Sequence, residues 1–158
     1  MTKDAKFEDG VAKPLRLQAM DTEDLKVIST LVQDAVFPIT EMTWRPKERR
    51  FAALLNRFRW EDLDAAQKRG RAVERVQSVL SLSDVTKVAS QGIDRTDQDM
   101  ILSVLAIDFT PGKDGTGRIE LTLAGDGAIA LDVEAINAVL QDVTRPYQAP
   151  SRKVPDHG

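Results

Sequence analysis

Across residues 37–131 the apolar residues recur mainly at every second position, and this period constrains the fold more than any other feature of the sequence. A period of two places successive side chains on opposite faces of an extended strand. Turn sequences interrupt the pattern, above all at residues 111–117 and 125–127. The sequence therefore predicts a run of strands joined by short turns, which favours an antiparallel meander.

About seven or eight strands are expected. The segment at residues 100–109 is apolar on both faces, which is typical of a central strand. Residues 45–48 form a turn with Pro46 at its second position, and residues 61–70 form a polar connector with room for one helical turn. The predicted strands cover residues 15–19, 39–44, 50–60, 71–83, 85–91, 100–109, 118–124 and 128–131.

Two helices are expected, one near each end. Asp21 is a suitable N-cap for a helix over residues 22–34, with Glu23 and Asp24 in its first turn. Asp132 would cap a second helix, whose buried stripe would contain Val133, Ile136, Val139, Leu140 and Val143. The predicted fold class is α+β: an antiparallel meander, strongly bent or barrel-like, similar to pleckstrin-homology-like barrels. It forms one domain at residues 14–147, between a flexible arm at 1–13 and a disordered tail at 148–158.

The scarcity of two residue types excludes much chemistry. The chain has no cysteine, which removes disulfides, thiol nucleophiles and cysteine-ligated metals. Its one histidine, His157, lies in the predicted tail, so a catalytic triad or a histidine metal site is not expected. We therefore predict a non-enzymatic protein without a metal or cofactor. No apolar run reaches the length of a membrane span, and the polar N-terminus lacks a signal-peptide pattern, which predicts a cytoplasmic location.

Three local patterns have simple structural interpretations. Asp94, Asp97 and Asp99 could gather around a cation, but their spacing differs from that of a calcium loop and favours a solvated loop. Asp108 lies in the most apolar strand, where a buried carboxylate would need a partner, although a position near the strand end favours exposure. The glycines of residues 125–130 match a dinucleotide-binding pattern, but strands flank them, so a hairpin turn is predicted.

The charge distribution supplies the one indication of a partner. Ten of the 22 basic residues lie between Arg45 and Arg75, together with five acids, so this segment has a formal charge of +5. The whole chain has a net charge of −3, which leaves −8 for the remainder. A localised basic region attracts anions.

The predicted strand pairing gathers the arginines of this segment. If residues 50–60 and 71–83 pair, their even-numbered apolar residues share one face. The odd-numbered positions then share the other, where guanidinium groups could bind phosphate or carboxylate. We expect this anion-binding face to contain Arg57, Arg59, Arg71 and Arg75, with a second basic group at the turn formed by Arg45, Lys47, Arg49 and Arg50.

Two interpretations of this surface stay open. In the first, the protein is a binding module whose anionic partner is RNA, an acidic protein or a phosphorylated small molecule. In the second, the arginines are satisfied within the protein or bridge the subunits of a homo-oligomer, and no external ligand exists. The acids that could pair with them are Glu48, Glu61, Asp62 and Glu74.

One resemblance covers nearly the whole chain, from about residue 14 to about residue 144. It is carried by residues 45–51 and 54–58, by Asp24-Leu25 with residues 33–36, and by residues 127–129 followed by Val133-Glu134. In these motifs the chain resembles a family of uncharacterised alphaproteobacterial proteins, domain of unknown function 2948. The resemblance implies a small bacterial single-domain protein. It implies no activity, ligand or site residue.

Overall fold

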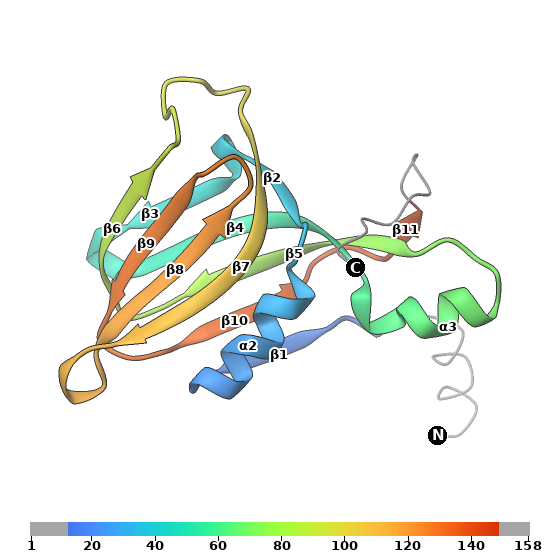
Figure 1. The fold of residues 1–158 in the computed structure, drawn as a ribbon, viewed down its shortest axis with the longest axis horizontal. Coiled ribbons are helices and arrows are strands. Elements are labelled where there is room, and N and C mark those ends of the chain that lie inside the picture. Colours follow the sequence, from blue (N-terminus) through green and yellow to red (C-terminus); the bar gives the residue numbers. More distant parts are fainter. Residues whose placement is uncertain (1–12, 149–158) are drawn as a thin grey trace.

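The computed structural model describes residues 13–148, and their main element is an antiparallel sheet of 11 strands (Figure 1). The α-helices are α2 (Thr22–Leu31) and α3 (Leu63–Lys68), and the 3-10 turns are η1 (Ile39–Glu41), η2 (Pro46–Glu48), η3 (Trp60–Asp62) and η4 (Lys113–Gly115). The predicted α+β class is confirmed, although the strands outnumber the seven or eight expected. The strands are β1 (Arg16–Ala19), β2 (Val36–Pro38), β3 (Met42–Arg45), β4 (Arg50–Phe58), β5 (Glu74–Leu82), β6 (Val85–Gln91), β7 (Ile101–Pro111), β8 (Gly117–Leu123), β9 (Ala128–Val133), β10 (Ala138–Asp142) and β11 (Tyr147–Gln148).

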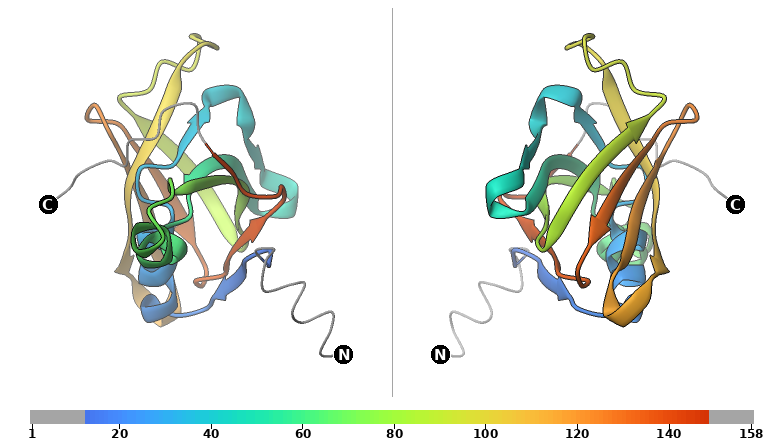
Figure 2. Two further views of the ribbon diagram at one scale, coloured as in Figure 1. Left: turned by 90° about the vertical axis from the view of Figure 1, so that its right-hand side faces the viewer. Right: turned by 90° about the vertical axis from the view of Figure 1, so that its left-hand side faces the viewer.

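The sheet bends at β2 into two layers that face each other (Figures 1 and 2). Layer A has the spatial order β1, β10, β5, β4, β3, with β11 paired to the end of β5, and layer B has the order β7, β8, β9, β6. β2 joins the layers because Val36 lies opposite both Asn56 of β4 and Ser103 of β7. Within the described residues the bent sheet does not close, since β3 pairs only with β4 and β6 only with β9.

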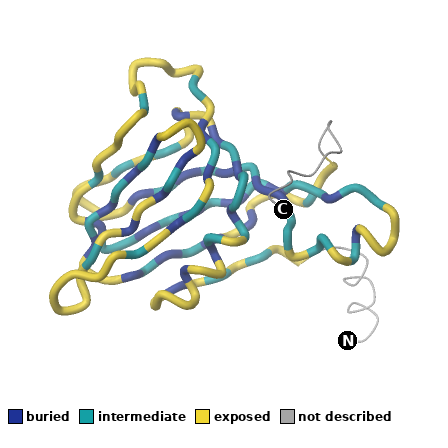
Figure 3. Tube along the Cα trace, viewed as in Figure 1, coloured by how far each residue is buried: buried dark blue, intermediate teal, exposed yellow. Residues whose placement is uncertain are grey.

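The core fills the space between the layers. Strand alternation places one face of each strand inside, and the buried positions visible along the strands in Figure 3 follow this period. Burial of each large apolar side chain contributes about 1.5–3 kcal/mol. The fully or almost fully buried residues of this core include Phe37, Phe51, Leu55, Leu80, Leu82, Ile119, Leu121, Leu123, Ile129 and Leu131.

Helix α2 packs against β1 and β7 along one side of the two layers. The side chain of Asp21 accepts a hydrogen bond from the backbone N–H of Asp24 at 2.8 Å, so the predicted N-cap is confirmed. Leu25 and Ile28 are buried on its inner stripe. The helix ends at Leu31, earlier than predicted.

A second helix at the C-terminal end was predicted and is wrong. The segment that would have formed it contains the end of β9, a turn and strand β10. Leu140 pairs with Leu80 of β5 and with Leu17 of β1. Asp132 is not an N-cap but a strand residue whose carboxylate accepts a hydrogen bond from Arg118. Pairing on both sides of β10 outweighs the helical spacing, and β-branched residues favour a strand here.

A β-bulge decides the position of Asp108. The register of β7 against β8 shifts between Val104 and Ala106. This shift turns Ile107 inward and leaves Asp108 exposed. The expected exposed position of this carboxylate is therefore confirmed.

The connection between β4 and β5 forms a small lobe, which we call the α3 lobe: η3, α3 and the adjoining ends of both strands. In Figure 1 it projects away from the two layers. Its own apolar cluster contains Phe58, Ala66 and Val73, with Trp60 and Leu63 packed against them. The indole N–H of Trp60 donates to the backbone carbonyl of Gln33 at 2.9 Å, which ties the lobe to the end of α2.

Among the described residues, no helix is long and apolar enough to cross a membrane. The arm predicted at residues 1–13 and the tail predicted at 148–158 lie outside the described residues, apart from Lys13 and Gln148.

Candidate functional site

The register of β4 against β5 decides which of the predicted arginines share a side. Phe51 lies opposite Leu82 and Arg57 lies opposite Val76, so odd positions of β4 share a face with even positions of β5. Arg57 therefore faces the interior, whereas Arg75, opposite Phe58, belongs to the other face. The predicted register, which placed Arg57 and Arg75 together, is wrong.

The cause of this error lies at the end of β4. The expectation used Leu54, Phe58 and Trp60 as the buried stripe of one strand. In the structure Phe58 and Trp60 belong to the apolar cluster of the α3 lobe, and the odd-numbered Phe51 and Leu55 enter the main core. Aromatic residues that pack in a different element thus shifted the apparent period by one position.

Arg57 is fully buried and all of its donor groups have partners. Its two terminal nitrogens each donate to one carboxylate oxygen of Glu61 at 2.9 Å. One also donates to Asp142 at 3.0 Å and the other to the carbonyl of Phe58 at 3.1 Å, while Nε donates to Ser78 at 2.9 Å. Burial alone would lower the pKa of Arg57, but Glu61 and then Asp142 outweigh it and raise that pKa. This guanidinium is a structural element and is not offered to solvent.

Arg59 and Arg71 are also paired, in the α3 lobe. Arg59 contacts Glu74 at 2.5 Å and Asp62 at 3.4 Å. Arg71 contacts the same Asp62 oxygen at 2.7 Å. The hydrogen bond from Arg71, followed by the charges of the neighbouring arginines, lowers the pKa of Asp62 against the opposing effect of burial. Four alternating charges therefore neutralise one another in the lobe.

Arg75 lies on the outer side, where Phe58 and Asn56 hold it. Its guanidinium carbon is 4.1 Å from the centre of the Phe58 ring, a cation–π contact. Its Nε donates to the side-chain oxygen of Asn56 at 2.5 Å, and the Asn56 amide donates to the Tyr147 hydroxyl at 2.6 Å. Burial lowers the pKa of Arg75, an effect that Tyr147 and Asp34 partly offset.

Two residues of the predicted basic turn also have acidic partners. Arg45 lies 3.3 Å from Glu48 within the β3–β4 hairpin. Arg49, at the left-handed position that ends η2, pairs with Glu134. The interpretation in which the segment's arginines pair with its own acids is therefore confirmed for Arg45, Arg57, Arg59 and Arg71.

The remaining cations of the hairpin are different. Lys47 and Arg50 are exposed, and no carboxylate within residues 13–148 forms an ion pair with either. Arg50 lies directly opposite Arg45, so two guanidiniums start from Cβ atoms about 5 Å apart. Beside them is an open pocket of about 310 Å³, lined by Thr43, Arg45, Glu48, Arg50 and Ala52.

The two arginines at this pocket belong to a larger cationic surface. We use "outer face of layer A" for the strand positions of that layer that point away from layer B. Cross-strand partners share a face, so the register places them all. Its basic residues are Arg16, Arg45, Arg50 and Arg75, and none of its positions is acidic. The other positions are Gln18, Thr43, Ala52, Leu54, Asn56, Phe58, Gln77, Val79, Ser81, Val139, Gln141 and Tyr147.

The outer face of layer B has the opposite character. Lys87 lies opposite Asp132, which lies opposite Arg118. Arg118 donates to Asp132 at 3.0 Å. In the next row Glu120 lies opposite Asp108, so acids slightly outnumber bases there. The charged strand positions on the outer face of layer A are therefore all basic, although Glu48 of the adjoining turn pairs with Arg45.

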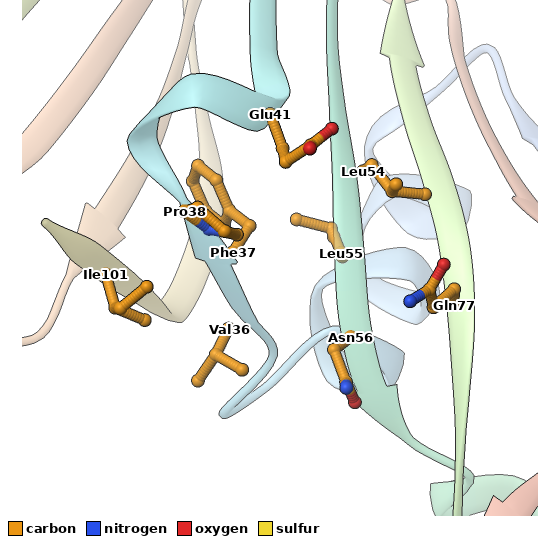
Figure 4. Close-up of a pocket in the computed structure, with 9 residues that line it drawn as sticks. All are labelled: Val36, Phe37, Pro38, Glu41, Leu54, Leu55, Asn56, Gln77 and Ile101. Carbon is orange, nitrogen blue, oxygen red and sulfur yellow. The ribbon is translucent and has the colours of Figure 1, made fainter. Parts of the chain in front are cut away.

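A second groove adjoins the outer face of layer A at the junction of β2 with β4 (Figure 4). Its volume is about 330 Å³. Figure 4 shows Glu41 above it and the amides of Asn56 and Gln77 at its other end. No cation lines this groove, so its chemistry does not suit an anion. Its other lining residues are Val36, Phe37, Pro38, Leu54, Leu55 and Ile101.

The aspartates of the β6–β7 loop form turns. Asp94 accepts hydrogen bonds from the backbone and hydroxyl of Thr96, which lower the pKa of its carboxyl group. Asp97 accepts from the backbone of Asp99 at 3.1 Å. Within residues 13–148, no group of three or more histidines and acids has an arrangement that could hold a metal ion.

Comparison with known proteins gives one match. The family described as "Protein of unknown function (DUF2948)" covers residues 15–157. The chain belongs to this family. No curated protein and no solved structure matches it.

For this member of the family, sequence reasoning found the basic hairpin but missed Arg16. The alternation of residues 15–19 does place Arg16 outward. Its membership of the cationic face depends on β1 pairing with β10, however, and β10 was expected to be a helix. A long-range pairing was therefore needed to bring Arg16 to the face that contains Arg50.

Proposed function

We propose that this protein is a non-enzymatic binding module that holds an acidic protein partner on the outer face of layer A. The observation that carries the proposal is the charge of this face: arginines at four strand positions and no acid at any. Its centre is the opposed pair Arg45 and Arg50, whose planar guanidiniums suit carboxylate groups in bidentate geometry. Like charges in direct opposition are unfavourable; Glu48 offsets the charge of Arg45, and an anionic group of the partner would offset that of Arg50.

The composition of the face favours a protein over RNA. Its cations are arginines and not lysines, and small apolar residues such as Ala52 and Val79 lie between them. Arginine is enriched and lysine depleted at protein interfaces. Single-stranded RNA is held by aromatic stacking platforms, whereas among the described residues this face has one exposed aromatic side chain, that of Tyr147 at 37% exposure.

The decisive variant reverses the opposed pair, Arg45→Glu with Arg50→Glu. Its matched control, Lys87→Glu with Arg118→Glu, makes the same change of charge on the outer face of layer B. We expect the first variant to lose a salt-sensitive partner from native lysate, with at least a tenfold weaker retention, and the control to keep it. Binding of the partner that is the same for both variants contradicts the proposal.

Two further readouts distinguish the other interpretations. Capture that nuclease treatment abolishes identifies RNA as the partner and contradicts the protein assignment. Light scattering coupled to size exclusion tests the homo-oligomer: a salt-resistant dimer that Arg45→Glu with Arg50→Glu breaks assigns the face to a second copy of the chain. A bacterial origin, a cytoplasmic location and a pleckstrin-homology-like topology stay predictions, and the proposal does not depend on them.

A further inference from the structure

The open seam of the sheet contains a second site, separate from the cationic face. β3 and β6 are the two strands that leave the sheet unclosed. At one end the turn that follows β3 is tied to β6, because the backbone N–H of Val85 donates to the carbonyl of Arg49, the residue that ends η2, at 3.0 Å. Farther along they have no pairing with each other, and a cavity of about 120 Å³ opens between them.

Apolar side chains form the floor and walls of this cavity. Phe51 of β4 and Ile129 of β9, at 2% and 1% exposure, form the floor. Met42 and Trp44 of β3 and Val88 of β6 line it and are only partly buried. An apolar cleft that remains accessible through a gap in a sheet is suited to a small apolar group.

Two polar groups complete the lining. Ser90 extends from β6 on the same inner side as Val88, since their partners Ile129 and Leu131 are both buried. Arg95 comes from the β6–β7 loop, is exposed, and forms no ion pair with any carboxylate of residues 13–148. The neighbouring Asp94 already accepts two hydrogen bonds from Thr96. Arg95 therefore brings an available positive charge to an apolar cleft.

We infer that this seam binds a small amphipathic carboxylate, with its hydrocarbon part against Trp44, Phe51 and Ile129 and its carboxylate on Arg95. A guanidinium and a hydroxyl match a carboxylate in charge and in hydrogen bonding. An apolar cavity of about 150 Å³ holds benzene, so the present one suits a chain of about four to six carbons. The site lies on the inner side of the seam and does not use the opposed pair Arg45 and Arg50.

The two tryptophans provide the test, because one lines the cavity and the other lies in the α3 lobe. Titration with hexanoate, followed by ¹H–¹⁵N NMR, should shift the indole signal of Trp44 saturably and leave that of Trp60 unchanged. Trp60→Phe assigns the two signals. Hexanol and hexylamine, which have the same chain, should bind at least tenfold more weakly, because neither can accept hydrogen bonds as an anion from Arg95.

Two variants separate the charge from the cleft. Arg95→Gln, in an exposed loop, should weaken hexanoate binding at least tenfold and leave the weak binding of hexanol unchanged. Val88→Phe should block both ligands, with the unchanged Trp60 signal as evidence of folding. The inference is overturned if hexanoate leaves the Trp44 signal unchanged at a concentration of about 10 mM, which would reveal even a weak complex. It is also overturned if Arg95→Gln binds hexanoate as well as the wild type does.

Discussion

The two ends of strand β4 have similar sequences and opposite electrostatics. At the α3 lobe, Arg57 and Arg59 are surrounded by acids of the same lobe and of β10. At the β3–β4 hairpin, Arg50 is exposed opposite another arginine, and Glu48 is the one acid that the adjoining pocket contains. A high count of arginines therefore gives a neutral, structural network at one end and an open positive surface at the other.

The difference teaches that partner geometry, and not the number of cations, decides whether a basic segment can bind. In the lobe, Arg57 contacts an acid four residues away, and Arg59 contacts acids three and 15 residues away. At the hairpin, the cross-strand neighbour of Arg50 has the same charge. A net charge of +5 over residues 45–75 thus overstates the positive charge that the lobe offers to an external anion.

The largest expected effect on stability comes from replacing the buried Arg57. Arg57→Met should cost about 3–5 kcal/mol of unfolding free energy, because Asp142 would stay buried without its charged partner. Arg50→Met at the other end should change it by less than about 0.5 kcal/mol. Urea unfolding of both variants measures the difference. Equal effects would show that the two ends are not energetically distinct.

A double variant sharpens the same test. Replacing Asp142 by Leu in the Arg57→Met background removes the uncompensated carboxylate, and an apolar pair in place of a buried ion pair often regains stability. We expect the double variant to be more stable than Arg57→Met alone. The recovery should be incomplete, since Asp142 also accepts a hydrogen bond from the backbone of Leu15 at 2.9 Å.

Part of the fold was predictable because its patterns are local. The N-cap at Asp21, the turn at Pro46 and the hairpin at Gly125 each depend on neighbouring residues, and the structure has all three. The segment 132–143 was not predictable in this way. Its apolar residues suit a helix and a strand equally, and only the partners Leu80 and Leu17 of distant strands decide between them.

The candidate site was predictable in composition and not in arrangement. The sequence identifies the arginines, but a shift of one residue in register moves Arg57 from the surface to the interior. The acids that neutralise Arg57 come from residue 61 and from residue 142, and the second could not be inferred from proximity in sequence. A cationic surface thus becomes visible only when the pairing of every strand is known.

A change of pH should alter the stability that the α3 lobe contributes, and we expect an effect of intermediate size. The hydrogen bond from Arg71 lowers the pKa of Asp62 below the value of about 3.9 that it has in the unfolded chain. The stability that Asp62 contributes is therefore present above pH 4 or so, and is lost as the pH falls through the lower folded value. Asp62→Asn should have a lower free energy of unfolding than the wild type at pH 7. The difference between the two, measured by urea unfolding, should be smaller at about pH 3. A gap of constant size would contradict the ion-pair explanation.

The smallest expected change in stability is at the β3–β4 hairpin, where the sign of the change is more informative than its size. Arg50→Thr removes a like charge opposite Arg45 and introduces a residue that favours strands, so it should stabilise the fold by about 0.5 kcal/mol or less. The matched change on layer B, Arg118→Thr, removes the partner of Asp132 and should have the opposite sign. Thermal unfolding at low salt measures both differences, and 1 M salt should reduce both because the Debye length falls to about 3 Å. If Arg50→Thr destabilises the protein at low salt, Arg50 has a favourable partner in the chain itself, and the hairpin is no more available to an external anion than the α3 lobe.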